Sequence, residues 1–574
     1  MKNNKKEDKF TQGILALMIS QVVIKILGMI YSVYLTNKNG FGDSGNAIYM
    51  SGYQIYALLL AISSIGIPNA ISKLVSEKIA LKDFKGADRI FKVAMFVFSG
   101  IGFGCTVCLF FGAKKIAQVF LQIPEAEYTL KALSPAIFFV SVSSVIRGYC
   151  NGRNQIDITA KSQTIEQVFK SILTIMFVEI IGYLSDLNTK LMAAIANFAT
   201  TMATMISFIY IFRSNQKKRK KIVLQNRIFR KEKIGSIVKR IFSVSIPMSI
   251  SSLLSSINKN IDSITVVRIL KKYLGENVAK ARYGILSTKI DLLVSLPLAF
   301  NIAFATALVP EIAGSLVKND FQNINKKIKF SFKVTILIGL PCTAGMFMYS
   351  EQILNLLFPN ASAGAALLRL SSVTIVLNVL TQTINGILQG IGKNRAPAIA
   401  LFYGMIIKFI GNIVFIPIGG IYEKGAVIGN ILCHFVSYIY VAKTLKEHIQ
   451  LDFKIRDLFF KPVLISIIMM IFSFSIYSYM KYLCIYEYIC TIGGILSAIV
   501  IYIIFVFIFR IFSEEEVCML PKGEKINIFL NKIQKRKSAE NTGIRIKWNV
   551  KILENGEKKK IVEKKRRILA HFGE

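Results

Sequence analysis

Fourteen apolar runs follow one another along this chain of 574 residues, each about as long as a bilayer is thick. A transmembrane helix needs about 20 mostly apolar residues. No water satisfies backbone polar groups inside a bilayer, and an apolar run of this length meets that requirement as an α-helix. The sequence therefore predicts an all-α polytopic membrane protein with about 14 transmembrane helices. They are expected at approximately 11–35, 47–70, 89–112, 128–148, 162–184, 190–212, 241–268, 283–312, 330–349, 363–389, 396–418, 423–442, 461–480 and 484–511.

The basic residues lie mainly between these runs. The chain has 72 Lys and Arg against 33 Asp and Glu, a formal net charge of +39. With the N-terminus inside, the inside segments before residue 513 hold 36 basic residues and the outside loops hold 11. This bias predicts a multi-pass protein of the cytoplasmic membrane whose N- and C-termini both face the cytoplasm. Nucleic acid is not an expected partner, because no recognition fold accompanies the charge.

An internal repeat divides the chain. The stretch Arg147-Gly-Tyr-Cys-Asn-Gly152 recurs as Asn385-Gly-Ile-Leu-Gln-Gly390, and the same offset of 238 aligns Lys170 with Lys408. A register chosen partly for its lysines aligns Lys25 with Lys259. Six helices per copy is an even number, so the two copies enter the membrane from the same side and form parallel repeats.

The repeat and the charge pattern together predict five regions. We expect an N-lobe of helices 1–6 in residues 1–212, a basic cytoplasmic linker at 213–240, and a C-lobe of helices 7–12 in 241–442. Two further helices follow in 443–512 and a basic cytoplasmic tail in 513–574. Such a duplicated scaffold is typical of transporters whose site lies between the lobes, near the membrane midplane.

A few charged residues lie deep inside the predicted spans. A charge at the bilayer centre is costly, so embedded ionisable residues usually face a cavity and have a function. The candidates are Lys25 in helix 1, Lys259 in helix 7 and the repeat-related pair Lys170 and Lys408. Glu166 lies four residues before Lys170, where a helical pair is expected. For each of these lysines the alternative is a structural ion pair, and a local pair is expected for Lys289 and Asp291.

Inward-facing lysines from both halves predict a positively charged cavity. Such a cavity attracts an anion, and phosphate or pyrophosphate is the first class to consider, because lysine binds it as a point charge. The few acids in the spans argue against a cationic substrate. The three His and eight Cys are too scattered for a metal site, so we expect no metal and no cofactor; a coupling ion or the membrane potential is left open.

Several motifs together resemble a known family. Ile24-Lys-Ile-Leu-Gly28, Gly66-Ile-Pro-Asn-Ala-Ile-Ser-Lys-Leu-Val-Ser-Glu77, Ser134-Pro135 and Leu296-Pro297 are similar to segments of the stage V sporulation protein B-like polysaccharide and lipid II flippases. These belong to the multidrug/oligosaccharidyl-lipid/polysaccharide exporter superfamily. The resemblance implies a two-lobed flippase fold and alternating access. It also implies that Lys25 matches one basic cavity residue of lipid II flippases and that Lys73 lies in the region of a second.

The expected function is therefore transport rather than catalysis. The first hypothesis is a flippase that moves an undecaprenyl-pyrophosphate-linked saccharide, with a peptidoglycan precursor such as lipid II as first choice, from the inner to the outer leaflet. Its expected partners are this lipid-linked pyrophosphate and membrane lipids. One alternative is a cation-coupled multidrug antiporter on the same fold. The other is a non-transporting scaffold that binds cell-wall synthesis enzymes.

Overall fold

The computed structural model describes most of the chain, and every regular element in the described ranges is a helix. Those ranges are residues 23–61, 67–153, 155–184, 186–223, 232–317, 320–393, 395–451, 458–484, 486–509, 511–512 and 516. The predicted tail at 513–574 lies outside them except for Glu516, as do residues 1–22 and residues 224–231 of the predicted linker.

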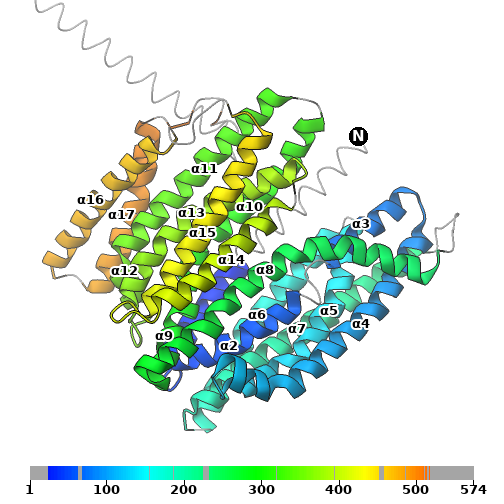
Figure 1. Cartoon of the computed structure of the whole chain (residues 1–574), viewed down its shortest axis with the longest axis horizontal. Coiled ribbons are helices and arrows are strands. Elements are labelled where there is room, and N and C mark those ends of the chain that lie inside the picture. Colours follow the sequence, from blue (N-terminus) through cyan, green and yellow to red (C-terminus); the bar gives the residue numbers. More distant parts are fainter. Residues whose placement is uncertain are drawn as a thin grey trace, which may run out of the picture. The chain divides into compact units, whose positions relative to one another are not determined.

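The helices of the first half overlap the six predicted spans, but the span predicted at 47–70 is divided between two helices, the second of which extends to Ala80 (Figure 1). After the helix Val23–Asn37 they are α2 (Gly42–Leu60), α3 (Ile67–Ala80), α4 (Phe84–Lys115), the π-helix η2 (Ile116–Leu121), α5 (Ala126–Gly152), α6 (Ile156–Leu184) and α7 (Thr189–Val223). Asp83 begins α4 by accepting a hydrogen bond from the backbone N–H of Gly86 at 2.8 Å, which satisfies one of the free donors of the first turn.

The second half repeats this pattern and adds two helices. Its elements are α8 (Ile234–Leu274), α9 (Glu276–Gly284), the π-helix η3 (Ile285–Ile290), α10 (Asp291–Val317), α11 (Phe321–Met348), α12 (Ser350–Leu357), α13 (Ala365–Gly390), α14 (Ala396–Phe415), α15 (Glu423–His448), α16 (Phe460–Tyr482) and α17 (Glu487–Ile508).

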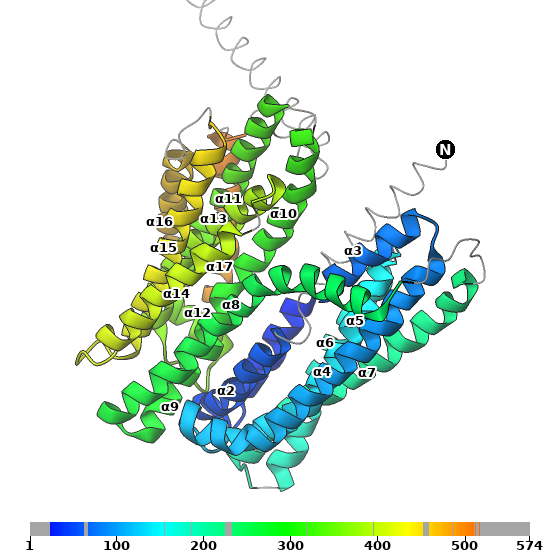
Figure 2. The same ribbon diagram turned by 45° about the vertical axis from the view of Figure 1, so that its right-hand side comes forward.

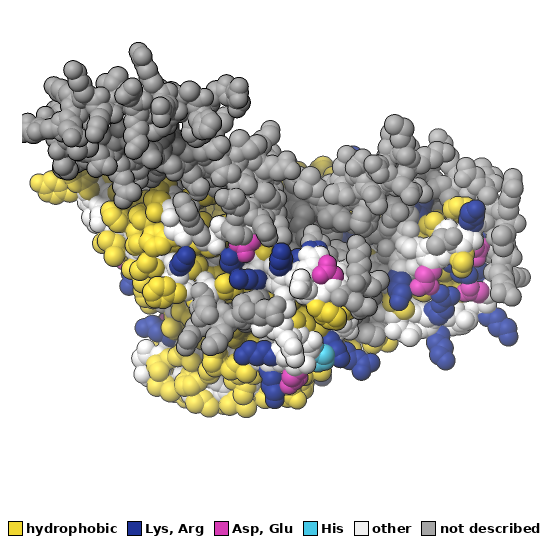
Figure 3. All heavy atoms as spheres, turned by 90° about the horizontal axis from the view of Figure 1, so that it is seen from above, with side chains coloured by type: hydrophobic (Ala, Val, Ile, Leu, Met, Phe, Trp, Pro, Cys, Tyr) yellow, Lys and Arg dark blue, Asp and Glu magenta, His cyan; other side chains and the backbone are white. Residues whose placement is uncertain are grey.

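Eleven helices in the described ranges are long and apolar enough to cross a membrane. Large apolar side chains on their outer faces are exposed, as lipid-facing residues must be; Ile471 on α16 and Leu496 on α17 are more than half exposed. Lys and Arg side chains instead gather on the end of the molecule that Figure 3 shows. The predicted all-α polytopic membrane fold is confirmed, whereas the number fourteen stays a prediction.

Helix α8 connects the two halves (Figure 2). Its first turns pack in the core of the first half, where Ile237 and Ile241 join a buried cluster with Ile71 of α3 and Phe91 of α4. Lys78 of α3 forms an ion pair with Glu232 just before α8, and Arg240 contacts Glu77 at 2.8 Å. Helix α8 also packs against α9 and α14 of the second half, and Arg268 near its end donates a hydrogen bond to the carbonyl of Val119 in η2 at 2.9 Å.

The two halves also contact each other at the end where α2 begins. Lys289 of η3 is completely buried and lies 2.9 Å from a carboxylate oxygen of Asp43, the second residue of α2. Lys280 of α9 contacts Glu125 before α5 at 2.8 Å. The chains pass so closely that a Cβ on Gly284 would collide with the backbone oxygen of Asp43. Charged pairs between the halves therefore close this end of the helix bundle.

Candidate functional site

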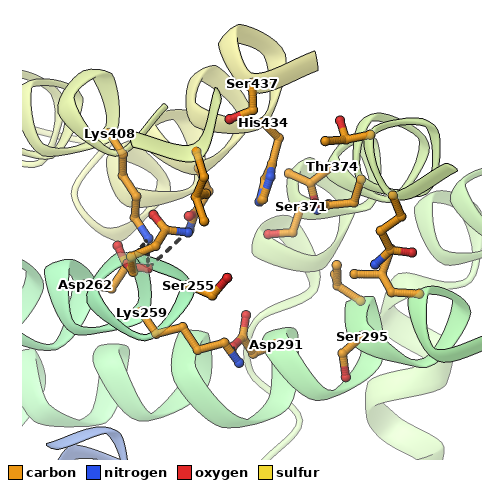
Figure 4. Close-up of a pocket in the computed structure, with 18 of the residues that line it drawn as sticks. Ser255, Lys259, Asp262, Asp291, Ser295, Ser371, Thr374, Lys408, His434 and Ser437 are labelled. Carbon is orange, nitrogen blue, oxygen red and sulfur yellow. Dashed lines mark hydrogen bonds and ion pairs between the residues drawn. The ribbon is translucent and has the colours of Figure 1, made fainter. Parts of the chain in front are cut away.

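A polar cavity of about 530 Å³ lies among the helices of the second half. Residues of α8, η3, α10, α13, α14 and α15 line it, and Gln54 of α2 reaches it from the first half. Its volume is in the usual range for small-molecule sites, about 300–1,000 Å³. The lining includes Lys259, Lys408, Asp262, Asp291 and His434, so two of the predicted site lysines face this space (Figure 4).

Lys259 and Asp291 meet at one side of the cavity. The Nζ of Lys259 lies 3.6 Å from Oδ2 of Asp291, and both side chains are more than half exposed. Lys25, on the helix Val23–Asn37 of the first half, is also exposed and lies within electrostatic range of both residues. Asp291 pairs with Lys259, and the additional charge of Lys25 leaves more positive than negative charge where the halves face each other.

Lys408 has a different environment from Lys259. It is 1% exposed, and its ammonium donates hydrogen bonds to Oδ2 of Asp262 at 2.6 Å and to the carbonyl of Asn258 at 2.8 Å. Asn412 donates to the other oxygen of the same carboxylate at 3.1 Å. A fully satisfied internal pair of this kind costs far less to bury than two separate charges. Lys408 therefore neutralises Asp262 in the cavity wall.

Lys170, aligned with Lys408 by the repeat, lies among tyrosines. It is 6% exposed, and its Nζ is 4.4 Å from the ring centroid of Tyr53 and 5.2 Å from that of Tyr31. The negative faces of aromatic rings attract a cation, by about 2 kcal/mol or more where water is excluded. The two halves therefore stabilise the same buried charge in different ways, one with rings and one with a carboxylate.

We expect the ring of Tyr53, rather than its hydroxyl, to hold Lys170 in place. Replacing Tyr53 by Leu should lower the free energy of unfolding by about 2 kcal/mol, because the ammonium loses its nearest ring. Tyr53→Phe keeps the ring and should change the free energy of unfolding by less than about 0.5 kcal/mol. Thermal unfolding in detergent measures the stability of both purified variants against wild type. Equal losses for both variants would show that the hydroxyl matters instead.

Two pairings predicted from sequence spacing are wrong. Glu166 does not pair with Lys170; its carboxylate accepts a hydrogen bond from Arg147 of α5 at 2.7 Å. Lys289 does not pair with Asp291, because its ammonium reaches Asp43 across the boundary between the halves. In each case the nearest partner comes from a neighbouring helix, because a long side chain follows the packing of its helix and not the spacing along it.

Of the six predicted site residues, the structure brings Lys259 and Lys408 to the cavity and Lys25 near Lys259. Lys170 and Glu166 lie in the first half with the partners described above, and Lys73 is exposed on α3. Sequence reasoning did not select Asp291 as a cavity residue, nor the row of polar residues on α13. The row has a readable signal, since its members recur at intervals of three and four residues in an otherwise apolar span.

An all-helical, multi-pass membrane protein with charged and polar residues gathered in a cavity among its spans has the architecture of a membrane transporter. The family model "Polysaccharide biosynthesis protein" matches residues 10–316, more than half of the chain, and the chain belongs to this family. A second model, MatE, matches residues 247–414. Both families are part of the predicted exporter superfamily, and the predicted recognition is confirmed.

Individual relatives agree with this placement. The chain is 24% identical to the lipid II flippase MurJ of Bacillus subtilis over 466 residues, which cover 78% of this chain and 84% of the relative. It is 23% identical to the stage V sporulation protein B of the same organism over 519 residues, covering 89% and 98%. A solved structure of a lipid II flippase MurJ in an inward closed conformation superposes with a TM-score of 0.63 at 17% identity, covering 86% and 99%.

Proposed function

We propose that this protein is an alternating-access flippase for an undecaprenyl-pyrophosphate-linked saccharide, with a peptidoglycan precursor such as lipid II as its substrate. The observation that carries the proposal is the group of Lys25, Lys259 and Asp291. It consists of the exposed pair of Lys259 and Asp291, which lines the cavity, and of the exposed ammonium group of Lys25 from the other half, which lies within electrostatic range of that pair. A pyrophosphate can satisfy both lysines at once, and it can do so only while the two halves lie close together.

The topology suggests how access would alternate. The excess of Lys and Arg in alternate loops predicts that the N-terminus lies in the cytoplasm, and the end closed by Lys289 and Asp43 would then be the external one. The lipid-linked headgroup would enter from the inner leaflet, bind at Lys25 and Lys259, and leave once the pairs at the external end separate. The lipid tail would remain in the bilayer throughout. Membrane lipids are therefore the second partner.

Replacing the two exposed lysines tests the proposal. Lys25→Ala and Lys259→Ala should each lower the rate of lipid II translocation in reconstituted vesicles by roughly ten- to a hundredfold, because each removes a charged contact worth about 1.5–3 kcal/mol. Lys25→Arg should retain most activity, since it keeps the charge. Lys131→Ala is the matched control, because the side chain of Lys131 is 41% exposed and pairs with Glu127 on its own helix.

Two results would contradict the proposal. If the wild-type protein does not translocate lipid II, lipid II is not its substrate. If both alanine variants translocate lipid II at the wild-type rate, the two lysines have no part in the mechanism. A scaffold for cell-wall enzymes would show neither translocation nor dependence on these lysines. Its function would instead require the region 513–574.

The pairing of the acidic residues in the cavity disfavours the multidrug antiporter alternative. An organic cation needs a free carboxylate in its binding site. Both carboxylates of the cavity lining already have a lysine partner, Asp262 with Lys408 and Asp291 with Lys259. Drug resistance on overexpression that is lost in an Asp291→Asn variant would reverse this preference.

A further inference from the structure

One face of α13 consists entirely of uncharged polar side chains where it lines the cavity. Three are hydroxyls and four are amides, and each lies three or four residues from another member on one helix face. We call this face the polar track. Its members are Ser371, Thr374, Asn378, Thr381, Gln382, Asn385 and Gln389.

The polar track is nearly as long as the membrane is thick. From Ser371 to Gln389 the helix rises about 27 Å at 1.5 Å per residue, against a hydrocarbon core of about 30 Å. A binding pocket for a small ion needs only one turn of such residues. A continuous row suits a polar group that must keep its hydrogen bonds while it moves from one membrane surface toward the other.

Helix α15 supplies a shorter polar row on another wall of the same cavity. Asn430, His434 and Ser437 lie at intervals of four and three residues and line this space. Figure 4 shows the His434 ring extending toward Ser371 and Thr374. Hydroxyl, amide and imidazole groups both donate and accept hydrogen bonds, as sugar hydroxyl and acetamide groups do.

Some hydrogen-bond acceptors of the polar track have no partner within the protein or keep a free lone pair. The hydroxyls of Thr374 and Thr381 donate to carbonyls of their own helix but keep lone pairs that can accept. Among the described residues, the buried oxygen Oδ1 of Asn385 has no hydrogen-bond partner. A buried acceptor without a partner is costly, and a ligand that donates to it removes that cost.

The duplicated fold does not require the first three residues of the track to be polar. At the offset of 238 that aligns the repeats, Ser371, Thr374 and Asn378 correspond to Leu133, Ala136 and Val140 of α5, which are buried. The remaining members correspond to polar residues of α5, namely Ser143, Ser144, Arg147 and Asn151. Polar residues at the first three positions of the track therefore need a reason other than the repeat.

We infer that the saccharide moves along the polar track of α13. The track forms hydrogen bonds with the hydroxyl and acetamide groups of the sugar while Lys25 and Lys259 bind the pyrophosphate. This inference rests on the proposed function. It assigns the two parts of the substrate to different sets of residues, a neutral set for the sugar and a charged set for the phosphates. Variants of the track should thus change affinity only for ligands that carry sugar.

Binding of two probes separates these contributions. Dissociation constants are measured for lipid II and for undecaprenyl pyrophosphate, which lacks the saccharide, with the full-length protein in nanodiscs. The double variant Asn378→Leu with Asn385→Leu keeps the branched shape and the number of side-chain heavy atoms and removes two amides. We expect it to weaken lipid II binding about tenfold and to leave binding of undecaprenyl pyrophosphate unchanged. Ser372→Ala is the control, because Ser372 is on the same helix but does not line the cavity.

A second variant guards against misfolding of the first. Gln389 is exposed at the end of α13, so Gln389→Met should fold normally and weaken lipid II binding about threefold. If lipid II binds all variants as well as wild type, or if both probes weaken equally, the track does not read the sugar, while the proposed function stands. If wild-type protein binds neither probe, the proposed function fails and this inference fails with it.

Discussion

Replacing Lys408 by Ala is expected to destabilise the protein by about 3–5 kcal/mol, the usual cost of removing one partner of a buried ion pair. The variant leaves Asp262, 16% exposed in its side chain, without the ammonium that lies 2.6 Å away. Asn412 and Asn430 still contact the carboxylate, but neutral amides do not compensate its charge. The lost charge thus outweighs the remaining hydrogen bonds.

A compensating substitution separates charge from packing. The double variant Lys408→Met with Asp262→Asn removes both charges and keeps similar volumes, so most of the stability should return. Buried Cys150, Cys433 and Cys490 allow a thiol-reactive dye to report thermal unfolding in detergent. A melting temperature for Lys408→Ala equal to that of wild type would mean that Asp262 is already neutral, contrary to the ion pair described above.

Lys289→Met is expected to open the end of the bundle where the two halves meet. The substitution removes the ion pair with Asp43 and the 2.6 Å hydrogen bond to the carbonyl of Ala361. It leaves the Asp43 carboxylate largely buried, at a cost of about 3–5 kcal/mol to the closed state. Such a change shifts a two-state equilibrium by a factor of roughly 150 to 5,000 toward the open form.

Spin labels on exposed residues of the two halves measure this shift. Asp186 after α6 and Lys424 at the start of α15 are both exposed near the closed end, and the exposed Cys108 and Cys484 are first replaced by Ser. The distance between the labels should lengthen in Lys289→Met. Lys271→Met is the matched control, because Lys271 pairs with Glu276 within the second half at 2.5 Å. An unchanged distance in Lys289→Met would show that the pair of Lys289 and Asp43 does not hold this end of the bundle closed.

The candidate site was only partly readable from the sequence. Lys25 and Lys259 stood out because a lysine in the middle of an apolar span has few structural explanations. Asp291, the partner of Lys259, has no such signal, because it follows Lys289 by two residues and that spacing suggests a local pair. Lys408 has the same sequence signal as Lys25, yet the structure gives it a buried partner in Asp262. The depth of a charge in a span therefore identifies a candidate without revealing its partner.

The sequence by itself determined the class of this protein: the helical spans, the concentration of basic residues between them, the internal repeat and the family. These properties depend on local composition, because the bilayer selects each span by its own length and polarity. Only the tertiary structure decided which charges meet. Arg147 forms an ion pair with Glu166, Asp43 with Lys289, and Asp291 with Lys259, and the two partners of each pair lie on different helices. In a medium with little water, a charge is stabilised by whichever opposite charge packing brings closest, and packing is a property of the whole fold.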